Sequence, residues 1–200
     1  MLRRVHPLIL SGILLVAALL LAGIGPRERS LGLNVRLVYL HGAWVWTALL
    51  GFAAAALAGL AGLLFRRVGW QRASIALGQA ATLFWITYLP MSLLVMQANW
   101  NGLYLDEPRF RIGLDFALVA LLLQAGILLL GRPAWASAVN IVFLAGLAIS
   151  LATSREVMHP PSPIASSGWL ALQAYFAGLT LTCAAAGSQI ARWLLRRLVA

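Results

Sequence analysis

Charged residues are scarce in this sequence. Only 10% of its 200 residues are Asp, Glu, Lys or Arg, whereas roughly a quarter of the residues in soluble globular domains are charged. Hydrophobic residues make up 62% of the chain, and the mean hydropathy is +0.90. These values exclude an ordinary soluble domain. They predict an integral membrane protein in which little of the chain remains for an extramembrane domain.

Cysteine is nearly missing and lysine is missing altogether. Cys183 is the only cysteine, which excludes an internal disulfide, a paired-cysteine redox motif and a cysteine-rich metal site. All 15 basic residues are Arg, and the formal net charge is +10. A nucleic-acid-binding surface would gather this charge on one face, whereas here the arginines form short clusters between apolar runs. We therefore expect the clusters to set the membrane topology and to contact lipid headgroups, and we expect no nucleic-acid partner.

Six apolar stretches are each long enough to cross a bilayer as a helix. They are continuous and rich in Leu and Ala, so they predict transmembrane helices rather than alternating transmembrane strands. The first stretch could instead be a cleaved signal peptide, but its apolar part is long for one, and we expect a retained anchor. The sequence thus predicts an all-α protein with a single domain over residues 1–200. The predicted helices cover residues 7–24, 37–65, 73–96, 112–130, 134–153 and 169–195.

The charged residues predict the orientation of this bundle. With both termini in the cytoplasm, nine arginines lie on the inner side and six on the outer side. All five acidic residues then fall on the outer side. The predicted inner loops are too short to build a site, so we expect the functional chemistry on the outer side.

Two of the three histidines, His41 and His159, fall in predicted outer segments among aromatic and arginine side chains. That combination suits haem, because imidazole is a common axial ligand to haem iron and aromatic faces pack against the flat ring. Arginine can hold the propionates through bidentate, charge-assisted hydrogen bonds. Taken singly, however, His41 could be an interfacial hydrogen-bonding residue and His159 an ordinary loop residue. We interpret His6 as interfacial.

Three further expectations come from the residues themselves. Asp115 either pairs with Arg111, four residues earlier, or is a buried functional carboxylate, and we favour the pairing. The small residues of the segment 51–62 should permit close contact between helices. If haem binds, Arg109 and at least one other outer arginine should face the same cavity as the histidines. The candidates for this second arginine are Arg36, Arg111 and Arg155.

Three segments together carry a resemblance to a known family. Residues 39–46, Tyr-Leu-His-Gly-Ala-Trp-Val-Trp, resemble the entry to the second helix of the CcmC-type haem-delivery proteins in the cytochrome c assembly protein family. Residues 159–164, His-Pro-Pro-Ser-Pro-Ile, are similar to that family's second histidine segment. Residues 100–109 align without gaps with its tryptophan-rich loop. The order of the segments and the six-helix topology agree over nearly the whole chain.

The resemblance implies a site with specific residues. It implies that His41 and His159 ligate the iron of a transiently bound haem b, and that five further side chains contact the haem. These five are Trp44, Trp46, Trp100, Tyr104 and Arg109. The loop departs from the family pattern, because non-tryptophan residues stand at three tryptophan positions and Glu107 replaces an Asp. The three are Leu103, Tyr104 and Asp106.

We therefore expect a haem-handling protein of the bacterial cytoplasmic membrane that is not an enzyme. It would bind haem at the outer face and pass it on for c-type cytochrome maturation. The resemblance implies two partners, a haem acceptor chaperone and an ABC-type haem exporter complex. Three other functions stay open: a b-type cytochrome subunit, a haem-free structural subunit of a membrane complex, and a small-solute transporter. The cytochrome is disfavoured because the predicted inner half offers only His6 as a ligand.

Overall fold

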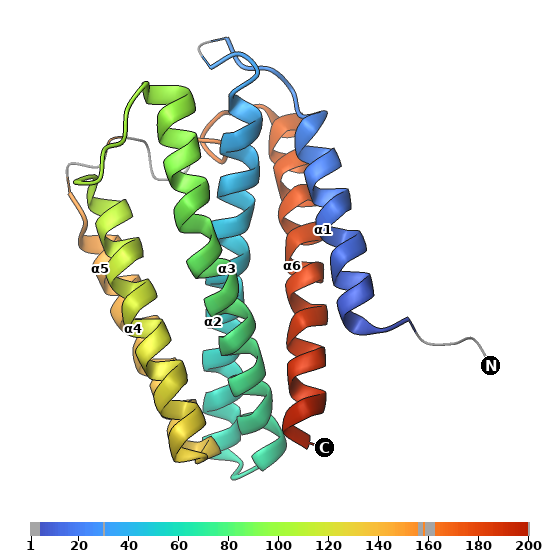
Figure 1. Ribbon diagram of the computed structural model, residues 1–200, viewed down its shortest axis with the longest axis vertical. Helices are drawn as coiled ribbons and strands as arrows, with labels where there is room; N and C mark the ends of the chain where they lie inside the picture. Colours follow the sequence, from blue (N-terminus) through green and yellow to red (C-terminus); the bar gives the residue numbers. More distant parts are fainter. Residues whose placement is uncertain (1–4, 30, 156–157, 159–162, 200) are drawn as a thin grey trace.

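The computed structural model describes residues 5–29, 31–155, 158 and 163–199 of the chain. These residues form six α-helices and, outside them, a single isolated β-bridge between Glu28 and Gly32 (Figure 1). The helices are α1 (Pro7–Gly23), α2 (Val35–Leu64), α3 (Val68–Trp100), α4 (Pro108–Leu130), α5 (Pro133–Thr153) and α6 (Leu170–Val199).

All six predicted helices are confirmed, although several are longer than the apolar stretches. The largest extension is in α3, which begins at Val68 rather than at residue 73 and ends at Trp100 rather than at 96. Hydropathy marks only the part of a helix that suits the hydrocarbon core, whereas backbone hydrogen bonding continues into the interfacial residues beyond it. Five helices, α2 to α6, are long and apolar enough to cross a membrane. The apolar helix α1 is shorter, with 17 residues.

Helix α2 occupies the middle of the bundle. It packs against α1, α3, α5 and α6, and α3 in turn packs against α4, α5 and α6. Helix α1 lies at one edge, against α6 and α2, and α4 lies at another, against α3 and α5 (Figure 1). Two helices of the bundle therefore keep much of their surface turned outward.

Small residues bring α2 close to its neighbours. A Cβ atom added at Gly51 would lie 2.8 Å from the Cβ of Ala81 on α3. One added at Gly59 would lie 3.0 Å from the carbonyl oxygen of Ser137 on α5. These separations are too short for larger side chains, so the prediction that the segment 51–62 permits close helix contact is confirmed.

Buried polar side chains add hydrogen bonds between the same helices. The Ser74 hydroxyl on α3 donates to the carbonyl oxygen of Ala55 on α2 at 2.8 Å. The amide nitrogen of Asn140 on α5 donates to the carbonyl oxygen of Ser74 at 3.0 Å and to its hydroxyl at 2.9 Å. These bonds tie three helices together and satisfy polar groups that are buried inside the bundle.

The two ends of the bundle differ in their connections. Residues 24–34, 101–107 and 154–169 connect the helices at one end, which we call the long-loop end. Residues 65–67 and 131–132 connect them at the other, the short-loop end, where α6 also terminates (Figure 1). Among the described residues, seven arginines and no acidic residue belong to the short-loop end. They are Arg66, Arg67, Arg72, Arg132, Arg192, Arg196 and Arg197.

Candidate functional site

His41 lies near the start of α2, two turns below the long-loop end, and is half-buried. Its Nδ1 atom is 3.5 Å from the hydroxyl of Ser92 on α3. Tyr88 lies on α3, one turn before Ser92, and its ring centroid is 5.9 Å from that of His41. Both contacts come from α3, so this helix fixes the direction of the imidazole. With Nδ1 beside Ser92, a metal ligated by this residue would bind Nε2.

Trp44 lies one turn further along α2 and also faces α3. Its indole nitrogen donates a hydrogen bond of 2.8 Å to the hydroxyl of Thr87, and its ring lies 4.6 Å from that of Phe84 between centroids. Trp46 is different. At 100° per residue, five residues place it about 140° around the helix from His41, and 45% of it is exposed. The structure brings Trp44 to the His41 side of α2 but not Trp46.

Trp100 and Tyr104 form an aromatic pair at the long-loop end. Trp100 is the last residue of α3, and the helix stops there because Asn101 adopts a left-handed conformation with φ 53°. The two rings meet edge to face with their centroids 5.7 Å apart. Tyr104 is exposed. This loop therefore presents an aromatic surface.

Glu107 is a buried residue of the site that the sequence analysis noted only as a substitution. It caps the N-terminus of α4, where one carboxylate oxygen accepts a 2.7 Å hydrogen bond from the backbone N–H of Phe110. The residue is only 4% exposed, and its Oε1 atom has no hydrogen-bond partner in the described part of the chain. The carboxylate also interacts electrostatically with Tyr88. Pro108 at the first helical position marks the start of α4 in the sequence, but no local signal marks Glu107 as buried.

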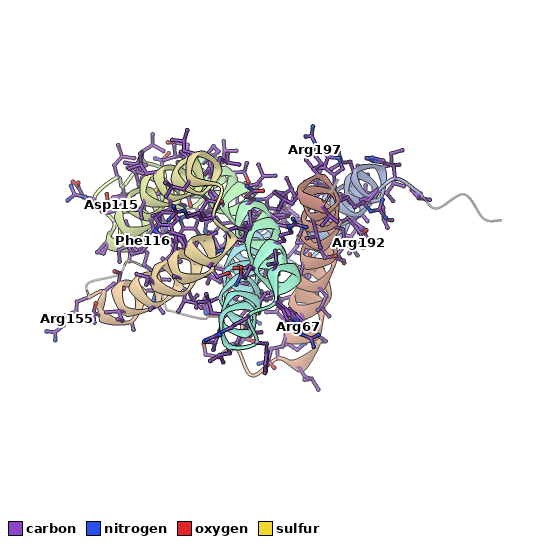
Figure 2. All side chains as sticks on the ribbon, turned by 90° about the horizontal axis from the view of Figure 1, so that it is seen from below. Arg67, Asp115, Phe116, Arg155, Arg192 and Arg197 are labelled. Carbon is purple, nitrogen blue, oxygen red and sulfur yellow. The ribbon has the colours of Figure 1, made fainter. Side chains whose placement is uncertain are left out.

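The four arginines predicted as possible partners of the propionates fall into three groups. Arg109, on the first turn of α4, is half-buried and makes no hydrogen bond or ion pair with another described residue. Arg36 donates from Nε to the carbonyl oxygen of Gly25 at 3.1 Å, which joins the start of α2 to the end of α1. Arg111 and Arg155 lie on the surface, and Figure 2 shows Arg155 pointing away from the bundle. Arg36 and Arg111 bind other groups of the chain, and Arg155 points outward. Arg109 is therefore the candidate that remains available for a propionate.

The predicted pairing of Arg111 with Asp115 is wrong. Arg111 pairs instead with Asp106, in the loop before the helix. Side chains on a helix lean toward its N-terminus, so the guanidinium of Arg111 reaches back to the loop rather than one turn forward. Asp115 is exposed, so the alternative of a buried carboxylate is also excluded.

His159 lies outside the described residues, so its convergence with His41 stays a prediction. Both flanks of its segment are placed at the long-loop end. Ser154 closes the end of α5 by donating to the carbonyl oxygen of Leu151 at 2.9 Å, and Ile164 packs against the main hydrophobic core. Both described flanks, at Ser154 and Ile164, therefore lie at the same end of the bundle as His41. In the described part of the chain, no group of three or more His, Cys, Asp or Glu side chains could hold a metal ion.

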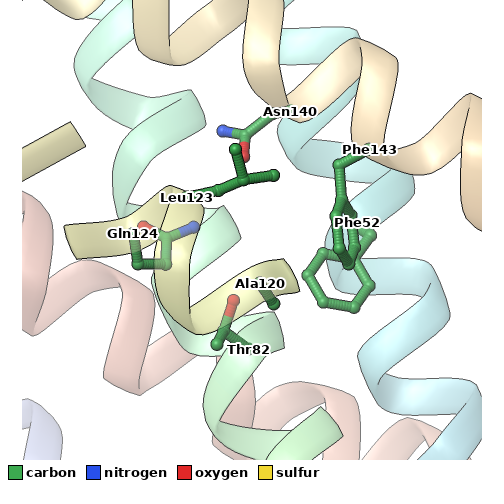
Figure 3. A pocket seen from close by; sticks show the side chains of 7 residues that line it. All are labelled: Phe52, Thr82, Ala120, Leu123, Gln124, Asn140 and Phe143. Atoms are coloured by element: carbon green, nitrogen blue, oxygen red, sulfur yellow. The ribbon is translucent and has the colours of Figure 1, made fainter. Parts of the chain in front are cut away.

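A narrow pocket lies deeper in the bundle, between α2, α3, α4 and α5 (Figure 3). It includes Phe52 of α2, which is 11 residues or about 16 Å below His41 along that helix, so it is separate from the candidate site. Its lining residues are Phe52, Thr82, Ala120, Leu123, Gln124, Asn140 and Phe143. In comparisons with known proteins, no protein-family model matches the chain, and no curated protein matches it.

Proposed function

We propose that this protein binds haem at the long-loop end of the bundle, through His41 and His159, and passes it to an acceptor for c-type cytochrome maturation. The placement of His41 is the observation that carries the proposal. Its imidazole is held by Ser92 and Tyr88, and Trp44 continues the same side of α2. The described flanks of the segment that carries His159 attach to the same end of the bundle.

Each residue has a role in capture and release. The imidazoles of His41 and His159 would hold the haem iron. Trp100 and Tyr104 cover part of the flat apolar ring, and Arg109 pairs with a propionate. The Ser92 hydroxyl keeps the His41 ring oriented so that Nε2 points at the metal. Because no covalent bond would be made or broken, the protein would act as a carrier and not as an enzyme, and its two histidines would release haem to an acceptor that competes for the iron.

The proposal includes a location. The arginines of the short-loop end favour the cytoplasmic side, because basic residues are enriched in cytoplasmic loops. The long-loop end would then face outward from a bacterial cytoplasmic membrane, with both termini inside. The partners in this arrangement are the lipid bilayer, a haem acceptor chaperone on the outer side and an ABC-type haem exporter complex that supplies the haem.

Haem titration of the purified protein tests the proposal. We expect a Soret band to develop on titration and to be lost or shifted in the His41→Ala variant, with the helical circular dichroism unchanged. His6→Ala is the matched control, because His6 caps the start of α1, at the opposite end of that helix from the long-loop end. A wild-type protein that takes up no haem would overturn the proposal and favour the haem-free structural subunit.

A further inference from the structure

Helix α4 is the long helix that the bundle covers least. It contacts only α3 and α5, and 22% of its most apolar window is buried, the smallest share among the five long helices. The rest of its surface faces outward along its whole length. Figure 2 shows Asp115 at the edge of the molecule on α4 and Phe116 toward α5, where its ring packs against that of Phe143.

The outward face of α4 carries a regular pattern. Exposed residues recur along it at alternating intervals of three and four, which is the heptad spacing of helices that pair in a left-handed coil. All six residues of this stripe are exposed. The stripe consists of Arg111, Leu114, Leu118, Leu121, Ala125 and Leu128.

Asp115 lies beside this stripe and distinguishes it from an ordinary lipid-facing surface. It is the one acidic residue within any of the six helices. It lies seven residues, or about 10 Å, below the start of α4, is exposed, and has no hydrogen bond or ion pair with another described residue. Charged side chains within membrane segments nearly always face a partner or the bundle interior, because hydrocarbon does not solvate them. We therefore expect a cation from outside this chain to pair with the carboxylate of Asp115.

A groove at the long-loop end of the same face holds both signs of charge. Its apolar floor is formed by Leu105, Phe110 and Leu114, and its charged side chains are Asp106, Arg111 and Asp115. Arg111 and Asp115 are one helical turn apart. When two identical helices pair in parallel across a two-fold axis, every contact occurs twice. If residue i of the first chain contacts residue j of the second, then residue j of the first also contacts residue i of the second. A guanidinium of Arg111 that turns away from Asp106 of its own chain can then reach the Asp115 of its partner.

We propose that this protein forms a two-fold symmetric dimer in the membrane through the α4 stripe, with Arg111 and Asp115 pairing reciprocally between the chains. The leucines supply the packing and the two ion pairs fix the register. A second copy meets both requirements, since the face carries leucines at heptad spacing and side chains of both charges. The inference does not depend on haem binding, because no residue of the proposed haem site belongs to the stripe.

Cysteine cross-linking tests the interface. Leu118→Cys places a thiol in the middle of the stripe, and oxidation in the membrane should give a product of twice the monomer mass. Val142→Cys is the matched control, since Val142 is 70% exposed on α5. It also lies at nearly the same depth from the long-loop end. Val142 is 11 residues before the last residue of α5, and Leu118 is 10 residues after the first residue of α4. The native Cys183 is fully buried, so wild type should remain monomeric on the gel. Equal yields for both variants, or a product of a different mass, would overturn the dimer.

Charge exchange tests the ion pairs independently of the thiols. In lipid nanodiscs or vesicles, Arg111→Asp and Asp115→Arg should each reduce the dimer fraction at least several-fold. The double variant should restore it, because the reciprocal pairs then form with reversed sign. Failure of the double variant to recover, with helicity unchanged in all three, would contradict the proposed pairing.

Discussion

Glu107 combines a stabilising contact with a destabilising one in a single side chain. Its Oε2 atom caps α4, and substitution of a capping side chain by Ala typically costs about 1 kcal/mol. Its Oε1 atom is buried without a hydrogen-bond partner in the described part of the chain, and an unsatisfied buried acceptor costs about 1–3 kcal/mol. A substitution that removes the charge but keeps the cap should therefore stabilise the fold, and one that removes the cap should destabilise it.

We expect Glu107→Gln to leave the apparent melting temperature in detergent unchanged or raised. The amide oxygen still accepts from the N–H of Phe110, and no charge remains buried. Glu107→Ala should lower the melting temperature, because α4 loses its cap. Asp106→Asn is the control at the neighbouring exposed position and should change stability by less than about 0.5 kcal/mol. If Glu107→Gln is as unstable as Glu107→Ala, the negative charge itself is needed, and Oε1 holds a cation or a donor.

Single-residue behaviour was only partly predictable from the sequence. The position of His41 at the entrance of α2 follows from the apolar run behind it. The partner of Arg111 does not, because three carboxylates, Asp106, Glu107 and Asp115, lie within reach along the chain, and the lean of helical side chains and the capping role of Glu107 decide between them. The burial of Glu107 depends on the packing of α4 against Tyr88 and α3, which no local pattern encodes. Convergence of His41 with His159 stays a prediction.

Whole helices were predictable because the bilayer requires them. Any segment that crosses hydrocarbon must satisfy its backbone internally, so a continuous apolar run of about 20 residues is sufficient evidence for a helix. Which helices touch is a separate question. The glycines of α2 predicted a close contact, but only the structure shows that Gly51 faces Ala81 of α3 and that Gly59 faces Ser137 of α5. Hydropathy carries no such lateral information, because lipid and protein interiors are equally apolar.

The contact between α2 and α3 should fail when Gly51 is enlarged. A Cβ at this position would lie 2.8 Å from the Cβ of Ala81, so Gly51→Val must push the helices apart, at a cost of about 1–3 kcal/mol. Gly12→Val is the control, because nothing lies within 4 Å of a Cβ added at Gly12 on α1. Thermal unfolding followed by circular dichroism in detergent compares the two.

An exchange of sizes checks the mechanism of this effect. Gly51→Ala combined with Ala81→Gly moves the methyl group from α3 to α2 and should recover most of the stability lost in Gly51→Ala alone. If Gly51→Val melts at the wild-type temperature, α2 and α3 have room that the structure does not show. If the exchange gives no recovery, another neighbour limits the size at residue 51.

At the scale of the whole molecule, the distribution of ligands between the two ends separates haem delivery from transmembrane electron transfer. Electron transfer across the bilayer needs haem near both faces, and so a second pair of axial ligands near the short-loop end. The helix ends and loops there, residues 60–72, 127–137 and 188–199, contain no His, Cys or Met. His6 is in the exposed segment before α1, and its Nδ1 atom accepts a hydrogen bond from the backbone N–H of Leu8 as the helix cap. The cytochrome alternative therefore lacks ligands in the part of the chain where it needs them.

We accordingly expect at most one haem for each polypeptide. Pyridine haemochrome analysis gives the haem concentration of the saturated protein, and quantitative amino-acid analysis gives the protein concentration. The molar ratio of haem to polypeptide should be no higher than one. The ratio should fall in His41→Ala and stay unchanged in His6→Ala. A dimer through α4 does not alter this value, because each chain contributes its own His41 and the stripe contains no ligand. A ratio of two would require a second pair of ligands near the short-loop end, where the described residues offer only His6, and it would promote the b-type cytochrome over the carrier.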